Sequence, residues 1–438
     1  MSPGLVPAWN DGLDWPTRPY SLFRDGAAPP GRGCPGEERL GPICLVGGTR
    51  PEALKLGPVA AAMNEVGRLR PFIVASGQHP TMFDEALSVF GLRPDATIGL
   101  TRDGGGQAEL VGRLIAGLDE LFARLRPPAV VVQGDTATTL AGALAAFWRG
   151  IPVVHLEAGL RSGDLTAPFP EEGNRCLVAR IATLHLTPTS LAERNLAAEG
   201  IGGGRVITVG NTIVDAAMAV SACRALFADE RVAEVVDRAS RQRCRLLLAT
   251  VHRRESWGEP MRRVLAAVAE LARTVPDVEV VLPTHPNPAV RDEVRRVLGD
   301  LDRVLVTDPL RYVDLLRLLK CATLVLSDSG GIQEEVASFG VPILVLRDVT
   351  ERTEAVTSGF ATLVGTDPDA IREAANARLD GDRARTARRG DNPFGDGRAR
   401  YRVEQAIAWQ LGLQVSPPEK FVALPPDDLG VAPAAVAS

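Results

Sequence analysis

The chain has 438 residues, of which 45% are hydrophobic and 24% charged, a balance typical of a globular protein with two domains. Forty-nine basic and 54 acidic residues give a net charge of −5, which excludes the strongly basic surface of a nucleic-acid-binding protein. The six cysteines form no C-x-x-C pair and no apolar run reaches the length of a membrane span, so we expect neither a zinc or disulfide scaffold nor a membrane anchor.

The first 41 residues are rich in proline, glycine and charge, as in DGAAPPGRGCPGEERLGP. This composition predicts a poorly ordered leader over 1–41. The first residues lack the basic and apolar regions of a secretory signal, and we therefore expect a cytoplasmic protein with reduced thiols.

Between 42 and 211 short apolar runs alternate with helical stretches. The runs ICLVGG, AVVVQGD, PVVHLEAG and VITVGN predict strands at 43–48, 129–135, 152–159 and 206–211. Their apolar residues are continuous rather than alternating, which indicates a parallel sheet covered on both faces. We predict a first doubly wound α/β domain at 42–211.

The stretch 212–243 is charged and poor in strand signals, and we interpret it as a connecting helical region. A second series of apolar runs predicts a second α/β domain at 244–390. Its strands are expected at 245–252, 278–285, 303–308, 323–331 and 341–346. The segment after Val415 is rich in proline and small residues, so 416–438 is predicted to be a loose tail.

The first predicted strand ends in Gly47 and Gly48, and a helix beginning near Pro51 follows. Glycines allow the backbone to approach a ligand, and proline suits the first turn of a helix. Arg50 and Lys55 can meet an anion near this helix start. An ordinary turn with solvated charges explains the same pattern equally well.

Three carboxylates form the strongest candidate site. Asp135 and Glu157 follow the ends of two apolar strands, and Glu171 follows in FPEEGNR. An unpaired buried carboxylate costs several kcal/mol, so such groups are ion-paired for structure or used in chemistry. Arg161 and Arg175 lie nearby in sequence and favour a site. His155 precedes Glu157 in HLEAG, and we interpret it as a brace rather than a catalytic residue.

His252 ends the first strand of the second domain and is followed by two arginines. A histidine in this position can act as an acid near neutral pH or bind a phosphate. A hydrogen-bonded surface histidine is the alternative. The other histidines lack metal-ligand spacing, so we expect no metal site.

The run DSGGIQEE joins a buried strand to a helix. Free backbone N–H groups at the helix start, around Ser329, Gly330 and Gly331, can bind a phosphate. Glu335 follows Gly331 by one helical turn and can accept hydrogen bonds from a ribose diol. Arg347-Asp348 and Glu351-Arg352 follow the next strand, and we expect them near the same site.

These segments together resemble the non-hydrolysing UDP-N-acetylglucosamine 2-epimerase family over residues 43–405. The matching motifs, in chain order, are GTRPEALK, GQH, QGDTATTLAGALAAF, HLEAGLRSGDLTAPFPEEGNR, VGNTIVD, VHRRES, DSGGIQEE, RDVTERTEAV and DNPFGDG. The resemblance implies a GT-B-like fold of two Rossmann-like domains, with the active site in the interdomain cleft. It also implies a final helix at 391–415 that crosses back to the first domain, a homodimer, and no bound cofactor.

Residue roles follow from the same resemblance. It implies four catalytic residues, namely Asp135, Glu157, Glu171 and His252. It implies that the substrate is bound by Arg50, Lys55, Ser329, Gly330, Gly331, Glu335 and Arg352. We add Arg175 to the substrate-binding residues because it lies near the carboxylates in the sequence.

The sequence departs from the family pattern at three places. Pro80 and Thr81 follow Gln78-His79, three consecutive glycines precede Gln107, and Thr353 replaces the usual proline. The first two fall where some family members have an allosteric substrate site, so substrate activation stays open. Gln78 and His285 are its possible remaining contacts.

The chemistry suggested is reversible inversion at C2 of UDP-N-acetylglucosamine. Because no carbonyl activates the C2 hydrogen, we expect elimination of UDP to a 2-acetamidoglucal and re-addition, with carboxylates exchanging the proton. Three alternatives stay open: a hydrolysing relative that releases N-acetylmannosamine, a GT-B glycosyltransferase, and a non-catalytic sugar-nucleotide sensor.

Overall fold

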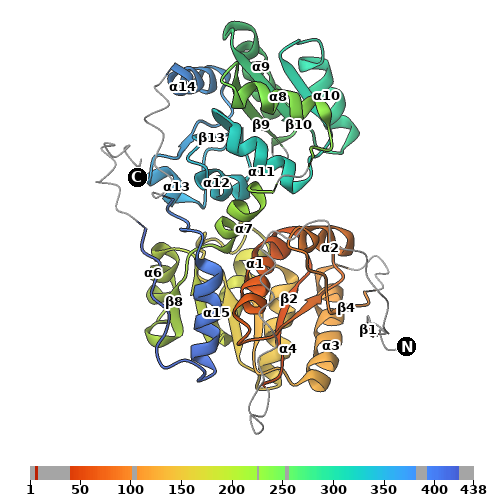
Figure 1. Ribbon diagram of the computed structural model, residues 1–438, viewed down its shortest axis with the longest axis vertical. Helices are drawn as coiled ribbons and strands as arrows, with labels where there is room; N and C mark the ends of the chain where they lie inside the picture. The colour runs from red at the N-terminus through yellow and green to blue at the C-terminus, as the bar shows by residue number, and fades with distance from the viewer. Residues whose placement is uncertain are drawn as a thin grey trace. The chain divides into compact units, whose positions relative to one another are not determined.

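The computed structural model describes residues 5–7, 40–100, 106–223, 226–251, 256–380 and 392–423. The chain divides into two compact units. Unit 1 comprises the chain up to Ala219 together with Gly395–Val422, and unit 2 comprises Val220–Phe394 and the last residues. Each unit is an α/β structure in which helices pack on a largely parallel sheet (Figure 1). The two-domain α/β class predicted from the sequence is therefore confirmed.

Unit 1 contains, among its described residues, an eight-stranded sheet in the order β1-β4-β3-β2-β5-β6-β7-β8. Its strands are β1 (Leu5–Pro7), β2 (Ile43–Gly47), β3 (Pro71–Ala75), β4 (Ala96–Ile98), β5 (Val130–Gln133), β6 (Val153–Leu156), β7 (Leu184–Thr187) and β8 (Val206–Thr208). All neighbouring strands are parallel except β1, which runs antiparallel to β4.

The helices of unit 1 connect these strands. They are α1 (Arg50–Val66), α2 (Pro80–Ser88), α3 (Gln107–Leu125), α4 (Ala137–Trp148), α5 (Glu171–Ile181), α6 (Ser190–Ala198), α7 (Thr212–Ser221) and α15 (Ala399–Gln410), with a 3₁₀ turn at Gly203–Arg205. The chain passes to unit 2 within α7 and returns just before α15.

Unit 2 contains a six-stranded sheet in the order β11-β10-β9-β12-β13-β14 within its described residues. The elements are α8 (Glu230–Ser240), β9 (Arg245–Thr250), α9 (Glu259–Thr274), β10 (Val278–Pro283), α10 (Pro288–Leu298), β11 (Val304–Thr307), α11 (Tyr312–Cys321), β12 (Leu324–Ser327), α12 (Gly330–Ala337), β13 (Ile343–Val345), α13 (Thr353–Thr357), β14 (Ala361–Leu363) and α14 (Pro368–Asp380).

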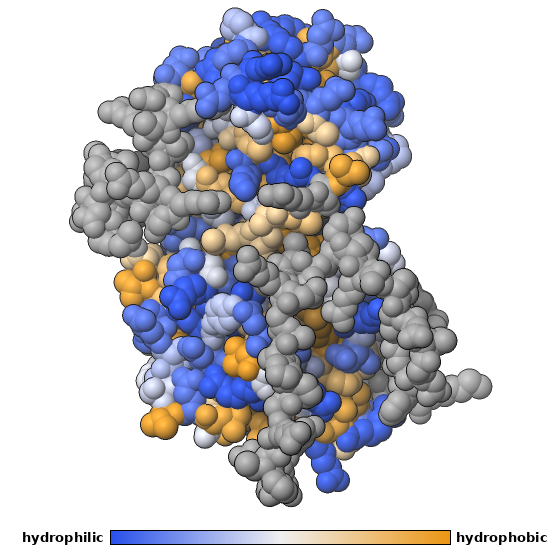
Figure 2. Space-filling model, viewed as in Figure 1, coloured by the Kyte–Doolittle hydropathy of each residue, from blue (hydrophilic) through white to orange (hydrophobic). Residues whose placement is uncertain are grey.

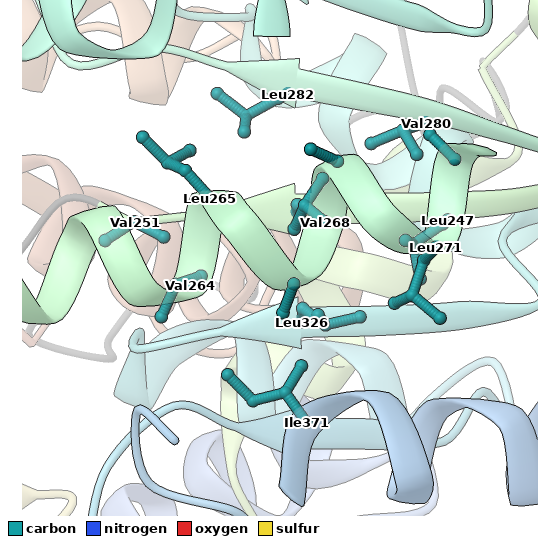
Figure 3. Close-up of a cluster of buried hydrophobic side chains, with 14 of the residues drawn as sticks. Leu247, Val251, Val264, Leu265, Val268, Leu271, Val280, Leu282, Leu326 and Ile371 are labelled. Atoms are coloured by element: carbon teal, nitrogen blue, oxygen red, sulfur yellow. The ribbon is translucent and has the colours of Figure 1, made fainter. Parts of the chain in front are cut away.

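The core of unit 2 shows why the sequence folds in this way. Leu247 and Leu326 point from neighbouring strands towards α9, whose Leu265 and Val268 face the sheet (Figure 3). Each fully buried side chain of this kind contributes about 1.5–3 kcal/mol relative to an exposed one. The opposite faces of α8, α9 and α10 carry charged residues, and Figure 2 shows this region as mostly hydrophilic. Amphipathic helices therefore cover a sheet whose strands are continuously apolar.

All nine strands expected from apolar runs are present, with bounds within four residues of those expected. Besides β1, which lies in the predicted leader, four short strands were not predicted, namely β3, β4, β7 and β14. Two have only three residues, β3 begins with a proline, and β7 (LHLT) is half polar. Pairing with neighbouring strands supplies what these segments lack in local propensity.

The chain ends are partly attached to unit 1. Residues 5–7 form β1, although they lie in the stretch expected to be a loose leader. In the segment predicted as a tail, Phe421 is buried and donates its backbone N–H to the carbonyl of Thr208 at 2.8 Å. Lys420 forms an ion pair with Glu193. The expectation of a loose end therefore does not hold for 420–421, because an edge strand offers unpaired backbone groups. Residues 8–39 and 424–438 lie outside the described residues.

Helix α15 packs on α1 and completes unit 1. Glu404 is buried and accepts hydrogen bonds from Arg68 of the loop after α1, at 3.0 and 2.6 Å. At the other end of α15, buried Asp215 of α7 accepts from the backbone N–H groups of Ala399 and Arg400 at 3.2 and 3.1 Å. Burial raises the pKa of Asp215 to about 7. This carboxyl group therefore connects α7, where the chain leaves unit 1, to the start of α15, where the chain has returned to unit 1.

Within the described residues, no helix combines the length and the apolar character needed to cross a membrane.

Candidate active site

Three loops of unit 1 lie at one edge of its sheet. They follow β2, β5 and β6, which are adjacent and parallel. The carboxyl ends of parallel strands form the edge where α/β proteins bind ligands. The predicted residues Arg50, Lys55, Asp135 and Glu157 belong to these loops or to the first turns of the helices after them.

Glu157 is held through both of its carboxylate oxygens. Lys55 of α1 forms a buried ion pair with Oε1, and the amide of Gln133 at the end of β5 donates to Oε2. The backbone of Glu157 has φ 63°, in the left-handed region that non-glycine residues rarely adopt. Such a conformation is kept only when the surroundings fix it, and it frequently marks a functional position.

Asp135 is held by helix α5. Arg175 donates to Oδ2 of Asp135, through Nε at 3.0 Å, and the side-chain amide of Asn174 donates to its backbone carbonyl at 2.9 Å. Arg175 is buried, whereas the side chain of Asp135 is 24% exposed. The carboxylate is therefore partly exposed to solvent while its Oδ2 is fixed by a buried cation.

Glu171 and Glu172 begin α5 and have different surroundings. Glu172 is buried, accepts from the backbone N–H groups of Ser162 and Gly163 at 3.0 and 3.1 Å, and lies 3.1 Å from Arg175. Glu171 is half-buried and has no hydrogen-bond or ion-pair partner among the described residues. Glu172 thus fixes the loop before the helix, whereas Glu171 is available to a ligand.

Glu52 is an important residue that the sequence interpretation did not select. It is 1% exposed, and its Oε2 accepts from the backbone N–H groups of Gly48 and Thr49 at 2.9 and 2.8 Å. Its Oε1 accepts from Thr136 Oγ1 at 2.7 Å. Burial raises its pKa, and these hydrogen bonds oppose that change. Glu52 therefore joins the loop after β2 to the loop after β5. The S/T-x-x-E spacing from Thr49 was the available signal.

Gly48 lets two loops approach closely. A Cβ atom at this position would lie 1.7 Å from Ser76 Oγ, so a larger residue requires the backbone to move. Ser76 in turn accepts from Thr138, whose hydroxyl also lies 3.1 Å from Gln78 Oε1. Gln78, one possible allosteric contact, is therefore hydrogen-bonded to the helix that follows the Asp135 loop.

Two histidines lie side by side beneath these loops. His155 and His185 pair in register on β6 and β7, and each is 1% exposed. Nε2 of His155 lies 2.7 Å from the carbonyl oxygen of Gly134. Burial lowers the pKa of His155 to about 4 and that of His185 to about 3, so both are neutral at physiological pH.

In unit 2 the predicted phosphate-binding turn follows β12. Ser329 is the N-cap of α12, and its hydroxyl accepts from the backbone N–H of Ile332 at 3.5 Å. Gly330 begins the helix, and a Cβ atom there would lie 3.2 Å from Cζ of Arg352. Arg352 therefore lies against the start of α12, where free N–H groups and the helix dipole favour an anion.

The charge of Arg352 is partly neutralised within unit 2. It donates to Glu334 at 3.0 Å and to Glu351 at 2.5 Å. Glu335, the predicted ribose ligand, is buried at the next position of α12. The site at this helix start is thus built mainly from backbone donors and one shared cation.

The remaining predictions divide between described and undescribed residues. His285 accepts from the backbone N–H of Asn287 at 3.1 Å and packs edge-on against Trp257, with ring centroids 5.4 Å apart. His252 lies outside the described residues, as do Arg253, Arg254 and Glu255. Arg347 and Asp348 line a surface cavity of about 560 Å³ next to β14 and α14. In the part of the chain that the structure describes, no group of histidine, cysteine and acidic residues could hold a metal ion.

The comparisons with known proteins agree with these features. The family model described as UDP-N-acetylglucosamine 2-epimerase matches residues 61–408. The UDP-N-acetylglucosamine 2-epimerase of Escherichia coli strain K12 is 40% identical over 83% of this chain and 98% of its own length. That of Bacillus subtilis strain 168 is 37% identical over 86% of this chain and 98% of its own.

A solved structure extends the agreement to the fold. The UDP-N-acetylglucosamine 2-epimerase from Neisseria meningitidis, bound to UDP-N-acetylglucosamine, is 33% identical. It superposes with a TM-score of 0.74 and covers 84% of this chain and 99% of that chain. Sequence and fold therefore agree over most of both chains: the protein belongs to the UDP-N-acetylglucosamine 2-epimerase family, as its motifs indicated.

Proposed function

We propose that this protein interconverts UDP-N-acetylglucosamine and UDP-N-acetylmannosamine. Family membership supports this activity, and so does the complex of the N. meningitidis relative with UDP-N-acetylglucosamine. The observation that carries the proposal is the pair of carboxylates, Asp135 and Glu157, on neighbouring strand ends, each oriented by a buried cation. Inversion of a C–H centre needs acid–base groups in fixed positions, which this arrangement supplies.

The proposed reaction begins with elimination. A carboxylate removes the proton from C2, the electrons of the C2–H bond form the C1=C2 double bond, and the C1–O bond breaks so that its electron pair leaves with UDP. The resulting 2-acetamidoglucal then receives a proton on the opposite face of C2 while a phosphate oxygen of UDP bonds to C1. No net oxidation occurs, so the reaction needs no redox cofactor.

The geometry supports different roles for the three carboxylates. Glu157 has both oxygens fixed by Lys55 and Gln133, and we assign it the stabilisation of positive charge developing at C1. The side chain of Asp135 is partly exposed, and that of Glu171 has no partner among the described residues. We assign proton exchange at C2 to Asp135 and Glu171.

The UDP group is assigned to the start of α12. The hydroxyl of Ser329 and the backbone N–H groups of Gly330 and Gly331 suit a diphosphate, whereas the N–H of Ser329 donates to Ser327 Oγ at 3.0 Å. Arg352 beside Gly330 adds positive charge. Glu335 is assigned to the ribose. We assign His252 as the donor to the departing phosphate, and this assignment rests only on its position in the sequence.

One experiment separates this activity from its alternatives. The protein is incubated with UDP-N-acetylglucosamine in deuterated water and followed by NMR. We expect a mixture of both UDP-sugars with deuterium at C2. Release of UDP with free N-acetylmannosamine would instead identify a hydrolysing enzyme, and binding without exchange at C2 would contradict an epimerase.

We also propose that the protein is a cytoplasmic homodimer. Helices α4 and α5 pack together and carry exposed apolar side chains, since Phe147, Trp148 and Leu177 are 50%, 63% and 58% exposed. Large apolar side chains that stay exposed on two packed helices are a feature of association surfaces. Trp148→Glu should convert a dimer into a monomer in analytical ultracentrifugation. A wild type that sediments as a monomer would contradict the dimer, and cell fractionation tests the location.

A further inference from the structure

His155 and His185 form a natural comparison within unit 1. They are paired on β6 and β7 and are equally buried. Among the described residues neither ring nitrogen of His185 has a hydrogen-bond partner, whereas Nε2 of His155 lies 2.7 Å from the carbonyl oxygen of Gly134. A carbonyl oxygen only accepts, so Nε2 carries the proton and donates. The two side chains differ in this one bond to the loop that carries Asp135.

The bonded carbonyl belongs to the peptide group between Gly134 and Asp135. Gly134 has φ 71°, and its N–H makes the last sheet bond of β5, to Leu156 at 3.0 Å. Beyond this point the backbone leaves the sheet and its direction is set by side chains. His155 fixes the peptide before Asp135, and Asn174 fixes the carbonyl after it at 2.9 Å. The Cα–Cβ direction of Asp135 therefore depends on both bonds.

The chemistry of the imidazole suits a fixed donor better than an acid or base. Burial is the main cause of its low pKa, and the charges of Arg161 and Arg175 act in the same direction. The ring therefore stays neutral across the pH range in which enzymes of this kind work. Nδ1 has no partner among the described residues, and Nε2 is occupied by the backbone.

We infer that His155 is a positioning residue for the epimerisation: its Nε2–H holds the Gly134 carbonyl and thereby sets the Asp135 carboxylate for proton exchange at C2. The inference rests on the proposed function. His185 has no such bond and serves only to fill the space beside it.

The test compares variants of His155 whose side-chain N–H either reaches the carbonyl oxygen of Gly134 or does not. In His155→Gln the amide nitrogen takes a position close to that of Nε2, whereas in His155→Asn it stays near that of Nδ1 and does not reach Gly134. His155→Leu removes the donor, and His185→Leu is the matched control for the loss of a buried imidazole. Each variant is assayed for kcat and KM with UDP-N-acetylglucosamine, for UDP affinity by calorimetry and for thermal stability.

We expect kcat to fall about 100-fold in His155→Leu and His155→Asn, because a misplacement of about 1 Å at a reacting group has an effect of this size. KM and UDP affinity should stay within about twofold of the wild-type values, because the contacts that bind the substrate equally well in the ground state and the transition state are unchanged. His155→Gln should recover kcat to within about threefold of the wild type. His185→Leu should keep the wild-type kcat, even where it changes the melting temperature.

Other outcomes overturn the inference. They are equal losses of kcat in the Gln and Asn variants, a wild-type kcat in His155→Leu, or a loss in His185→Leu as large as that in His155→Leu. Crystal structures of the Gln and Asn variants test the geometry without turnover, since the Gly134–Asp135 peptide should keep its orientation only in the Gln variant. A wild type without C2 exchange contradicts the proposed function, whereas an unchanged peptide in the Asn variant contradicts the positioning role.

Discussion

The candidate residues of unit 1 and those of unit 2 are built on the same kind of strand end but in different ways. In unit 1 the carboxylates of Asp135 and Glu157 are fixed by buried side chains. In unit 2 the start of α12 offers backbone groups, a serine cap and one arginine whose charge is shared. Fixed side chains suit proton transfer, which depends on the position of single atoms. Backbone donors suit the binding of a diphosphate, which spreads its charge over several oxygens.

The sharpest way to break this comparison is to neutralise Asp135. In Asp135→Asn we expect kcat to fall at least about 10³-fold, as is typical when an acid–base group is lost, with UDP affinity still measurable. The control is Asp119→Asn, which breaks an exposed ion pair with Arg149 and should leave kcat unchanged. NMR of C2 exchange gives the rate. Near-wild-type turnover of Asp135→Asn would contradict the assigned role.

A second change releases one oxygen of Glu157. Gln133→Leu removes the amide that donates to Oε2 of Glu157 and replaces it by an apolar side chain of similar size. We expect kcat to fall about 30-fold, because Glu157 loses one of the two side-chain contacts that fix its carboxylate. A wild-type kcat would show that the contact with Gln133 does not position Glu157 for turnover.

The complementary change in unit 2 should affect binding rather than proton transfer. Ser329→Ala removes the cap of α12 and a hydroxyl from the phosphate-binding turn. We expect UDP to bind about tenfold more weakly, which corresponds to about 1.4 kcal/mol, with a smaller change in kcat. Thr189→Ala removes an equivalent cap from α6 in unit 1 and should not change UDP affinity in calorimetry. Equal effects of both variants would indicate a general loss of stability.

The smallest effect concerns stability in acid. The pKa of His185 is about 3 in the folded protein, well below its value of 6.5 in an unfolded chain. Between these two values the unfolded state binds more protons, so stability falls as pH decreases through 6.5. When the pH falls from 7.5 to 5, the free energy of unfolding of His185→Leu should decrease by up to about 2 kcal/mol less than that of the wild type. Denaturant unfolding of both proteins at these two pH values measures the difference. Equal decreases in both proteins would show that His185 does not cause the loss of stability in acid.

Continuous apolar runs were sufficient to predict the two α/β units, because strands buried on both faces leave a strong sequence signal. The site was predictable where polar residues directly follow such runs, as with Asp135 and Glu157. Glu171 was selected over Glu172 through the family resemblance, because both stand in the first turn of α5 and only the fold shows that Glu172 is the one that turns inward. The role of Gln133 could not be predicted for a similar reason. It is the last residue of a buried strand, and Glu157, to which it donates, lies 24 residues away in the sequence.

The buried contact between Asp215 and α15 has a consequence for biosynthesis. Helix α15 covers α1 and is encoded after Val220–Phe394, so a ribosome that has just completed this stretch of unit 2 still holds a unit 1 that lacks one of its packing helices. The N-terminal unit therefore cannot reach its final form in the order in which it is made. Its last folding step has to wait for the synthesis of α15, and a fragment that ends at the first crossing exposes the face of α1 that α15 would cover.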